Sequence, residues 1–274
     1  MRSKYSRFIE EDIGQGDITS ELVVPLDAMA KGRIICKETC VLAGAKEASE
    51  IFKELGAKAV VKKKDGSRVK KGTIVLEVRG TARVLLAGER LALNVIMRMS
   101  GIATLTDSLV RKCRTINPKV KVAATRKTTP GFREFEKRAV ALGGGWPHRM
   151  GLYDAILIKN NHIKIAGGVK EALDRARRRN RKRRIEIEVE TAEQARIALE
   201  NGANIIMLDN FPPNDAGKLA RELKKRHPGV LIELSGGIRP ENIGKYAPAA
   251  DVISLGWLTH SVKSIDFSMR IEPE

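Results

Sequence analysis

The 274-residue sequence has few cysteines, few aromatic residues and no long hydrophobic run. Its three cysteines, Cys36, Cys40 and Cys113, cannot supply a four-ligand zinc cluster or a disulfide framework, so we expect small buried apolar side chains. No segment approaches the roughly 20 consecutive apolar residues of a membrane span, and no apolar stretch follows the first basic residues. We therefore expect no membrane segment, a cytoplasmic location and a chain long enough to bury its own core.

Acidic residues are outnumbered, and the formal net charge is +18. Such a charge favours anionic partners. The densest basic run, RARRRNRKRR at residues 175–184, ends a predicted helix just before a predicted strand, and few aromatic residues accompany it. We interpret it as a solvated helix end whose cations suit the helix dipole, and we expect no nucleic-acid partner. A nucleic-acid-binding protein remains the alternative from another functional class.

The second part of the chain alternates short apolar runs with amphipathic segments. The runs predict strands and are VKVAAT (120–125), AILIK (155–159), IEIEVE (185–190), NIIMLD (204–209), VLIELS (230–235) and DVISLG (251–256). Repeated strand–helix units predict a parallel sheet with right-handed crossovers. We interpret residues 103–263 as an incomplete TIM-like α/β barrel of six or seven strands, with an open doubly wound sheet as the alternative.

The first hundred residues have a different pattern and predict a smaller α+β domain over residues 1–102. It would contain an amphipathic helix at 45–55 and a hairpin-like segment, GSRVKKGTIVLEVRG. A long helix at about 86–113 is predicted to lead into the barrel. The alternating tail, SIDFSMRIEPE at 264–274, is predicted to return to the first domain.

Each predicted barrel strand ends in residues that could bind a ligand or take part in catalysis. The carboxyl ends of barrel strands meet at one mouth, where the active sites of this architecture lie. Arg126 and Lys127 follow the first strand, Lys159 ends the second, and His148 and Arg149 lie in the loop between them. Holding so many cations together is costly without counter-anions, so the cluster predicts a multiply anionic ligand. Arginine suits carboxylates and lysine suits phosphates.

Two features of that loop add to the prediction. Thr129-Pro130 is predicted to begin a helix, whose dipole would strengthen the positive field. The glycine run at 143–145 is predicted to let the backbone approach a ligand closely.

Carboxylates follow the third and fourth strands. Glu188 and Asp209 either neutralise the cations or hold Mg²⁺ and ribose hydroxyls. Strand alternation puts Glu186 and Glu190 on the face of Glu188, so the pattern leaves open which of the three serves. After the last two strands, SGG at 235–237 and LG at 255–256 suit either a phosphate site or tight turns.

Several motifs together resemble one family. TRKTTPG, EKRAV, GGGWPHRMGL, LIKNNH, IEVE, MLDN, SGGI and LTHS occur in the order and approximate spacing of quinolinate phosphoribosyltransferase, also called nicotinate-nucleotide pyrophosphorylase (carboxylating). EDIGQGDITS and GERLALNVIMRMSGIAT resemble the first domain and linking helix of this family. The resemblance therefore covers nearly the whole chain.

The resemblance implies an enzyme that joins quinolinate to 5-phosphoribosyl 1-diphosphate, with Mg²⁺ as cofactor. The products would be nicotinate mononucleotide for NAD synthesis, pyrophosphate and carbon dioxide. A pyridine dicarboxylate and a diphosphate would supply the anions that the cationic cluster requires.

The resemblance also assigns roles to residues. The positions matching the quinolinate site are Arg126, His148, Arg149 and Lys159, those facing the ribosyl diphosphate and Mg²⁺ are Lys127, Glu188 and Asp209, and those receiving the 5-phosphate are Ser235, Gly236, Gly237 and Gly256. The catalytic set is Lys127, Lys159, Glu188 and Asp209. Arg90, in GERLALN, matches an arginine that reaches the partner's site across a homodimer interface, so a monomer is expected to be inactive. Assembly of dimers into hexamers is left open.

The sequence departs from the family pattern at two positions. Leu234 stands where a second serine is frequent, and Trp257, where a small residue is usual, is expected to narrow or stack on the phosphate side of the site. His162 and His260 keep motif positions, and we expect structural hydrogen bonds from both.

Two enzymatic alternatives share this fold. A paralogue linked to molybdenum transport tends to lose the LIK-N-H pattern, which this chain keeps as LIKNNH. A relative that uses nicotinate without decarboxylation needs to recognise only one carboxylate, whereas Arg126, His148 and Arg149 together favour two.

Overall fold

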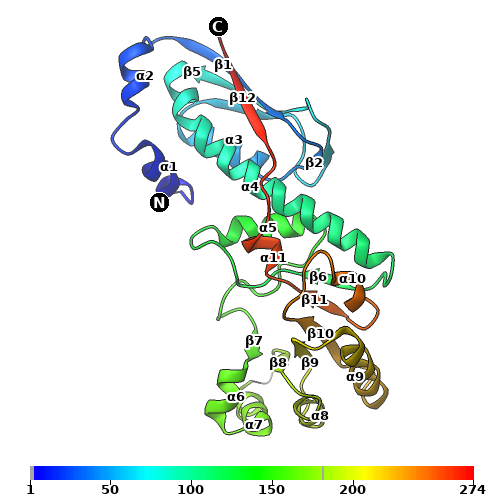
Figure 1. Ribbon diagram of the computed structural model, residues 1–274. Coiled ribbons are helices and arrows are strands. Elements are labelled where there is room, and N and C mark those ends of the chain that lie inside the picture. The colour runs from blue at the N-terminus through cyan, green and yellow to red at the C-terminus, as the bar shows by residue number, and fades with distance from the viewer. Residues whose placement is uncertain (1–2, 181) are drawn as a thin grey trace. The chain divides into compact units, whose positions relative to one another are not determined.

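The computed structural model describes residues 3–180 and 182–274 and divides into two compact units (Figure 1). One unit comprises Met1–Leu105 and Val262–Glu274, and the other comprises Thr106–Ser261. The division falls within α4 (Ala82–Arg114), the long helix predicted at about 86–113. Within the described ranges, no helix has the length and apolar character needed to cross a membrane.

The first unit contains a four-stranded antiparallel sheet in the order β12-β1-β5-β3. Its strands are β1 (Met29–Cys36), β3 (Lys58–Val61), β5 (Ile74–Thr81) and β12 (Phe267–Pro273). The C-terminal tail supplies β12, whose Phe267 lies opposite Cys36 of β1. The remaining elements are α1 (Ser6–Ile13), α2 (Ile18–Val23), β2 (Cys40–Val41), α3 (Ala45–Glu54) and β4 (Arg68–Val69).

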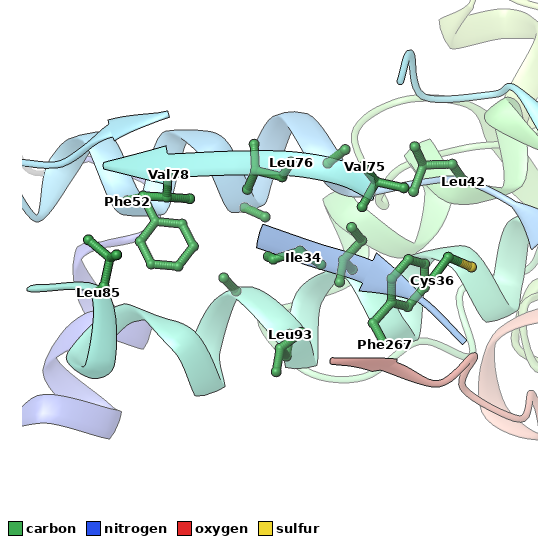
Figure 2. Packing of buried hydrophobic residues seen from close by; sticks show 14 of the residues in the cluster. Ile34, Cys36, Leu42, Phe52, Val75, Leu76, Val78, Leu85, Leu93 and Phe267 are labelled. Carbon is green, nitrogen blue, oxygen red and sulfur yellow. The ribbon is translucent and has the colours of Figure 1, made fainter. Parts of the chain in front are cut away.

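Side chains from both helices and strands build the core of this unit. Alternate residues of β1 are buried, as expected for a strand with one face on a core. Ile34 of β1 belongs to the same buried cluster as Phe52 of α3, Leu85 of α4 and Phe267 of β12 (Figure 2). All three cysteines of the chain are free and buried, as predicted.

The second unit contains a six-stranded parallel sheet in the order β6-β11-β10-β9-β8-β7. Its strands are β6 (Lys121–Ala123), β7 (Ile156–Ile158), β8 (Ile185–Val189), β9 (Ile205–Asp209), β10 (Leu231–Ser235) and β11 (Val252–Ser254). The first and second strands of the barrel, β6 and β7, stand at opposite ends of the order, and no ladder joins them in the part of the chain that the structure describes. A single parallel bridge between Ala123 and Trp146 extends the sheet beyond β6. The prediction of an incomplete TIM-like barrel is confirmed, and its seam lies between β6 and β7.

The helices follow the strands in sequence. They are α5 (Arg133–Leu142), α6 (Asn160–Ala166), α7 (Val169–Arg179), α8 (Ala192–Glu200), α9 (Pro213–Arg226), α10 (Ile243–Tyr246) and α11 (Trp257–His260). From α6 to α10, each helix contacts the next, which is the arrangement of a barrel's outer layer. The basic run ends α7 shortly before β8, as predicted, and its Arg181 lies outside the described residues.

Two local predictions between β6 and β7 are wrong. Thr129-Pro130 does not begin a helix, because Thr129 instead donates from its backbone N–H and its hydroxyl to the Glu136 carboxylate, and α5 begins at Arg133. The glycine run at 143–145 does not line the main pocket. A Cβ on Gly145 would lie 2.6 Å from Thr106 Cγ2, so this glycine serves close packing inside the unit.

Candidate active site

A pocket of about 650 Å³ lies at the carboxyl ends of the six parallel strands. Its lining contains five lysines or arginines and three acidic residues, which leaves an excess of positive charge. Eleven of the twelve predicted substrate-binding residues line it: Arg126, Lys127, His148, Arg149, Lys159, Glu188, Asp209, Ser235, Gly236, Gly237 and Gly256. Arg90 is exposed on α4 and is not among the lining residues.

Two arginines form the cationic side of the pocket. The Nε atom of Arg126 is buried and has no hydrogen-bond partner among the described residues. Arg149 is 8% exposed, and burial, together with the nearby charge of Arg126, lowers the pKa of its guanidinium. A buried guanidinium with an unused donor is costly, so this side of the pocket suits an anionic ligand.

An ion pair joins the second and third strand ends. Lys159 Nζ donates to Glu188 Oε2 at 2.5 Å. Asp209 ends the next strand, and burial, followed by the negative charge of Glu188, raises the pKa of its carboxyl. The charges of Lys159, Glu188 and Asp209 therefore influence one another in the pocket wall. His162 accepts the backbone N–H of Lys159 through Nδ1 at 2.9 Å, the structural role predicted for it.

The structure distinguishes the three glutamates that share a face of β8. Glu188 lines the pocket, whereas Glu190 is exposed and accepts a hydrogen bond from Asn160 Nδ2. Glu186 is only 3% exposed and lies deeper in the barrel.

Tight turns form the opposite side of the pocket. Gly236 has φ +84°, and a Cβ at this position would lie 2.3 Å from Asn210 Oδ1. Asn210 itself has φ 60° and donates its backbone N–H to Ser235 O at 2.9 Å. Trp257 lines this part of the pocket, as predicted for the phosphate side, and the Arg239 guanidinium carbon lies 5.6 Å from its ring centroid.

The floor of the barrel holds a buried polar cluster. His148 Nε2 lies 3.3 Å from Glu233 Oε2 and 3.5 Å from Glu186 Oε2, and the Ser254 hydroxyl donates to Glu233 Oε1. Burial, followed by the charge of Glu233, raises the pKa of Glu186 to about 9. This shift favours the protonated form of Glu186 at neutral pH.

The polar lining residues that received no binding role from the sequence include Asn210, Glu233, Arg239 and His260. Asn210 ends the motif MLDN and Arg239 directly follows SGGI, so the rule that selected the strand ends could have included them. Glu233 lies inside β10 rather than at its end. Its signal was an acidic residue in an otherwise apolar strand, which is costly unless the carboxylate has partners.

Comparison with known proteins identifies relatives of this chain in sequence and fold. The family model for the quinolinate phosphoribosyl transferase N-terminal domain matches residues 17–100, and that for the C-terminal domain matches residues 102–270. A probable nicotinate-nucleotide pyrophosphorylase [carboxylating] of Archaeoglobus fulgidus is 44% identical over 259 residues, covering 93% of this chain and 98% of the relative. The human nicotinate-nucleotide pyrophosphorylase [carboxylating] is 40% identical, covering 86% and 80%. The crystal structure of NadC from Streptococcus pyogenes has a TM-score of 0.89 at 37% identity, covering 97% and 94%.

Proposed function

The chain belongs to the quinolinate phosphoribosyl transferase family, and we propose that the pocket described above carries out the reaction of that family. The enzyme transfers the phosphoribosyl group of 5-phosphoribosyl 1-diphosphate to quinolinate, with loss of carbon dioxide and pyrophosphate. The product is nicotinate mononucleotide, an intermediate of NAD biosynthesis. The observation that carries the assignment to this pocket is the convergence of Arg126, Lys127, Arg149 and Lys159 with the carboxylates of Glu188 and Asp209 at one barrel mouth.

The cationic side of the pocket suits the two carboxylates of quinolinate. Arg126 offers an unused buried donor, and Arg149 is largely shielded from water. Guanidinium forks bind carboxylates through paired N–H donors, which fixes the orientation of a planar acid. In this orientation the pyridine nitrogen faces the sugar, as attack at C1 requires.

The acidic residues suit the ribosyl diphosphate together with Mg²⁺. Hard oxygen ligands such as Glu188 and Asp209 fit this ion. Burial, followed by the negative charge of Glu188, raises the pKa of the Asp209 carboxyl, and a bound cation would offset both effects. When bound, Mg²⁺ would neutralise charge on the diphosphate. The turns at residues 235–237 and 256 line the pocket together with Arg239, and their backbone N–H groups would bind the 5-phosphate.

The residues of the chain stabilise the charges that develop during the transfer. As the C1–O bond to the diphosphate breaks, negative charge grows on the leaving group and positive charge grows on the ribosyl ring. Lys127 and Lys159 stabilise the leaving group, and the carboxylates of Glu188 and Asp209 stabilise the ring. The pyridine nitrogen then forms the new bond to C1. Its positive charge stabilises the carbanion left at C2 when the 2-carboxylate departs as carbon dioxide, and C2 then takes up a proton from water.

The assay measures pyrophosphate and carbon dioxide released by purified protein with Mg²⁺ and 5-phosphoribosyl 1-diphosphate. We expect both products with quinolinate and neither with nicotinate, and we expect chelation of the metal to stop the reaction until Mg²⁺ is restored. An Asp209→Ala variant purified in parallel controls for contaminating enzymes. Pyrophosphate release from nicotinate would assign the chain to a non-decarboxylating activity. If neither acid gives a product, the result would favour the alternative function, that of the paralogue linked to molybdenum transport.

The proposal includes a homodimer with shared active sites, completed by Arg90 of the partner. Arg90 is exposed on α4, so it is available to a second copy. In the same unit, Ile18, Leu22 and Val23 of α2 expose at least 71% of their surfaces, and exposed apolar side chains grouped in this way favour burial against a partner.

Complementation between two inactive variants tests this arrangement. Arg90→Ala and Asp209→Ala are each expected to be inactive alone. After mixing and subunit exchange, mixed dimers contain one site with both residues intact, so activity should return. If light scattering gives a monomer with full activity, the dimer proposal is wrong. Light scattering also distinguishes dimers from hexamers.

A further inference from the structure

Glu233 is a buried carboxylate that the transfer reaction does not use. It lies in the middle of β10 and is 0% exposed. Its Oε1 accepts the hydroxyl of Ser254 from β11, and its Oε2 lies 3.3 Å from His148 Nε2. A carboxylate removed from water needs such donors, so the two contacts explain how the barrel tolerates it.

The ring of His148 has both nitrogens engaged within the protein. Its Nδ1 accepts the backbone N–H of Arg149 at 2.8 Å, so Nδ1 carries no proton. The ring proton therefore lies on Nε2, which faces Glu233 Oε2 at 3.3 Å and Glu186 Oε2 at 3.5 Å, with Glu233 the nearer acceptor. His148 also has φ 55°, a left-handed conformation that is uncommon outside glycine and needs surrounding contacts to hold it.

The segment that contains His148 crosses the seam of the barrel. Trp146 bridges to β6, and the buried ammonium of Lys137 donates to Pro147 O. Beyond Pro147 the chain leaves β6, and no ladder of the described residues joins it to β7. The next contact that holds this segment to the barrel is the one between His148 and Glu233 of β10. It lies directly before Arg149 in the chain.

We propose that Glu233 is a positioning residue for recognition of the dicarboxylate: by holding the His148 ring, it fixes the backbone of Arg149 and so aims that guanidinium into the pocket. This inference rests on the proposed function, in which Arg149 binds a carboxylate of quinolinate. The line of contacts runs from Ser254 through Glu233 and His148 to the Arg149 N–H. It performs at the seam the task that a strand ladder performs elsewhere in the barrel.

The experiment compares steady-state kinetics and melting temperatures of four proteins. These are the wild type, Glu233→Ala, the isosteric Glu233→Gln, and Asp251→Ala as a control. Asp251 also ties β11 to β10, through the Ile232 N–H at 2.8 Å, but at the amino end of the strands, away from the pocket. Asp251 also accepts a hydrogen bond from Lys224 Nζ of α9 at 2.7 Å, so its loss reports the cost of weakening contacts at this end of the barrel without disturbing His148.

We expect Glu233→Ala to raise the KM for quinolinate at least about tenfold, because small displacements of a binding group have large kinetic effects. The KM for 5-phosphoribosyl 1-diphosphate should change less than about twofold, because that substrate uses the other side of the pocket. Glu233→Gln keeps an acceptor for His148 and should recover most of the quinolinate KM. Asp251→Ala should lower the melting temperature and leave both KM values unchanged. If Glu233→Ala does not fold, Ser254→Ala, which removes one donor to Glu233, should raise the quinolinate KM about threefold.

Three outcomes would overturn the inference. In the first, the Glu233 variants lose activity only in step with their melting temperature, as Asp251→Ala does. In the second, both KM values rise equally. In the third, metal analysis finds a stoichiometric ion in the wild type that Glu233→Ala lacks, since ligand atoms of His148, Glu186 and Glu233 lie within 4.8 Å of one another and would then form a metal site. A wild-type protein that makes no product from quinolinate would instead refute the proposed function, on which the inference depends.

Discussion

Replacing Glu186 with glutamine should remove a pH dependence from the stability of the protein. Glu186 is 3% exposed, and burial together with the charge of Glu233 raises its pKa from 4.5 to about 9. In the unfolded chain the same carboxyl loses its proton near its ordinary value. Between these two pH values the folded protein therefore binds one more proton at this site than the unfolded chain.

The sign and the size of the effect follow from proton linkage. A raised folded-state pKa means that the stabilising contribution is complete below pH 4.5 and is lost as the pH rises toward about 9. Each pH unit in this window costs a little over about 1 kcal/mol of unfolding free energy, so roughly three units, from pH 5.5 to 8.5, cost about 4 kcal/mol. Glutamine has nearly the same shape and does not titrate, so Glu186→Gln should lack this slope.

Urea unfolding at several pH values, followed by far-UV circular dichroism, measures the effect. The relevant quantity is the difference between variant and wild type, in which the groups that do not interact with Glu186 cancel. We expect this difference to shift in favour of Glu186→Gln by about 4 kcal/mol across that range. Glu190→Gln, at the exposed position directly after the same strand, should run parallel to the wild type. Parallel curves for Glu186→Gln as well would mean that Glu186 is ionised in the fold and that the reasoning is wrong.

Three further substitutions address the pocket directly. Arg149→Lys keeps the charge but loses the fork, so the quinolinate KM should rise about tenfold with the diphosphate KM unchanged, and equal changes in both would contradict carboxylate binding by Arg149. Lys159→Ala leaves Glu188 without its ammonium, so unfolding free energy in urea should fall by about 1 kcal/mol, and this loss should vanish in a Glu188→Gln background unless the pair is uncoupled. Gly236→Ala should weaken binding of the diphosphate substrate, measured by calorimetry, and destabilise the protein by about 2 kcal/mol. Gly237→Ala, which also has positive φ but meets Asn210 Oδ1 only at 3.9 Å, should be milder, and equal losses would show that the clash has no effect.

The sequence predicted the strand ends well because barrel geometry brings them together whatever the intervening residues are. All six predicted strands are present, and their carboxyl ends line one pocket. The distance of a residue from the mouth of the pocket was harder to predict. Strand alternation places Glu186 and Glu188 on the same face, but it does not show which of them lies at the bottom of the barrel. The role of Glu233 also depends on a histidine 85 residues away in the chain, which no local pattern encodes.

The segment between β6 and β7 was predicted least well. Its conformation is decided by contacts distant in sequence, such as the approach of Gly145 to Thr106, rather than by local preference. Proline and glycine in this segment therefore suggested a helix start and a ligand-binding loop where the structure has a turn and a packing site. Arg90 shows a different limit, since its predicted role depends on a second copy of the chain.

The seam of the barrel separates the two halves of the pocket in a way that matters for evolution. Glu188, Asp209 and the turn at residues 235–237 are carried by strands in one continuous ladder, so changes there disturb their neighbours. The proposed dicarboxylate side is carried largely by the segment at residues 124–155, which crosses the seam. This segment bonds to β6 through the backbone of Trp146, and beyond it through side chains such as that of His148. We expect mutations in that segment to change which aromatic acid is accepted and to leave the proposed sugar-phosphate half intact. The unpaired edge of this barrel is thus the place where new acceptor specificities can arise.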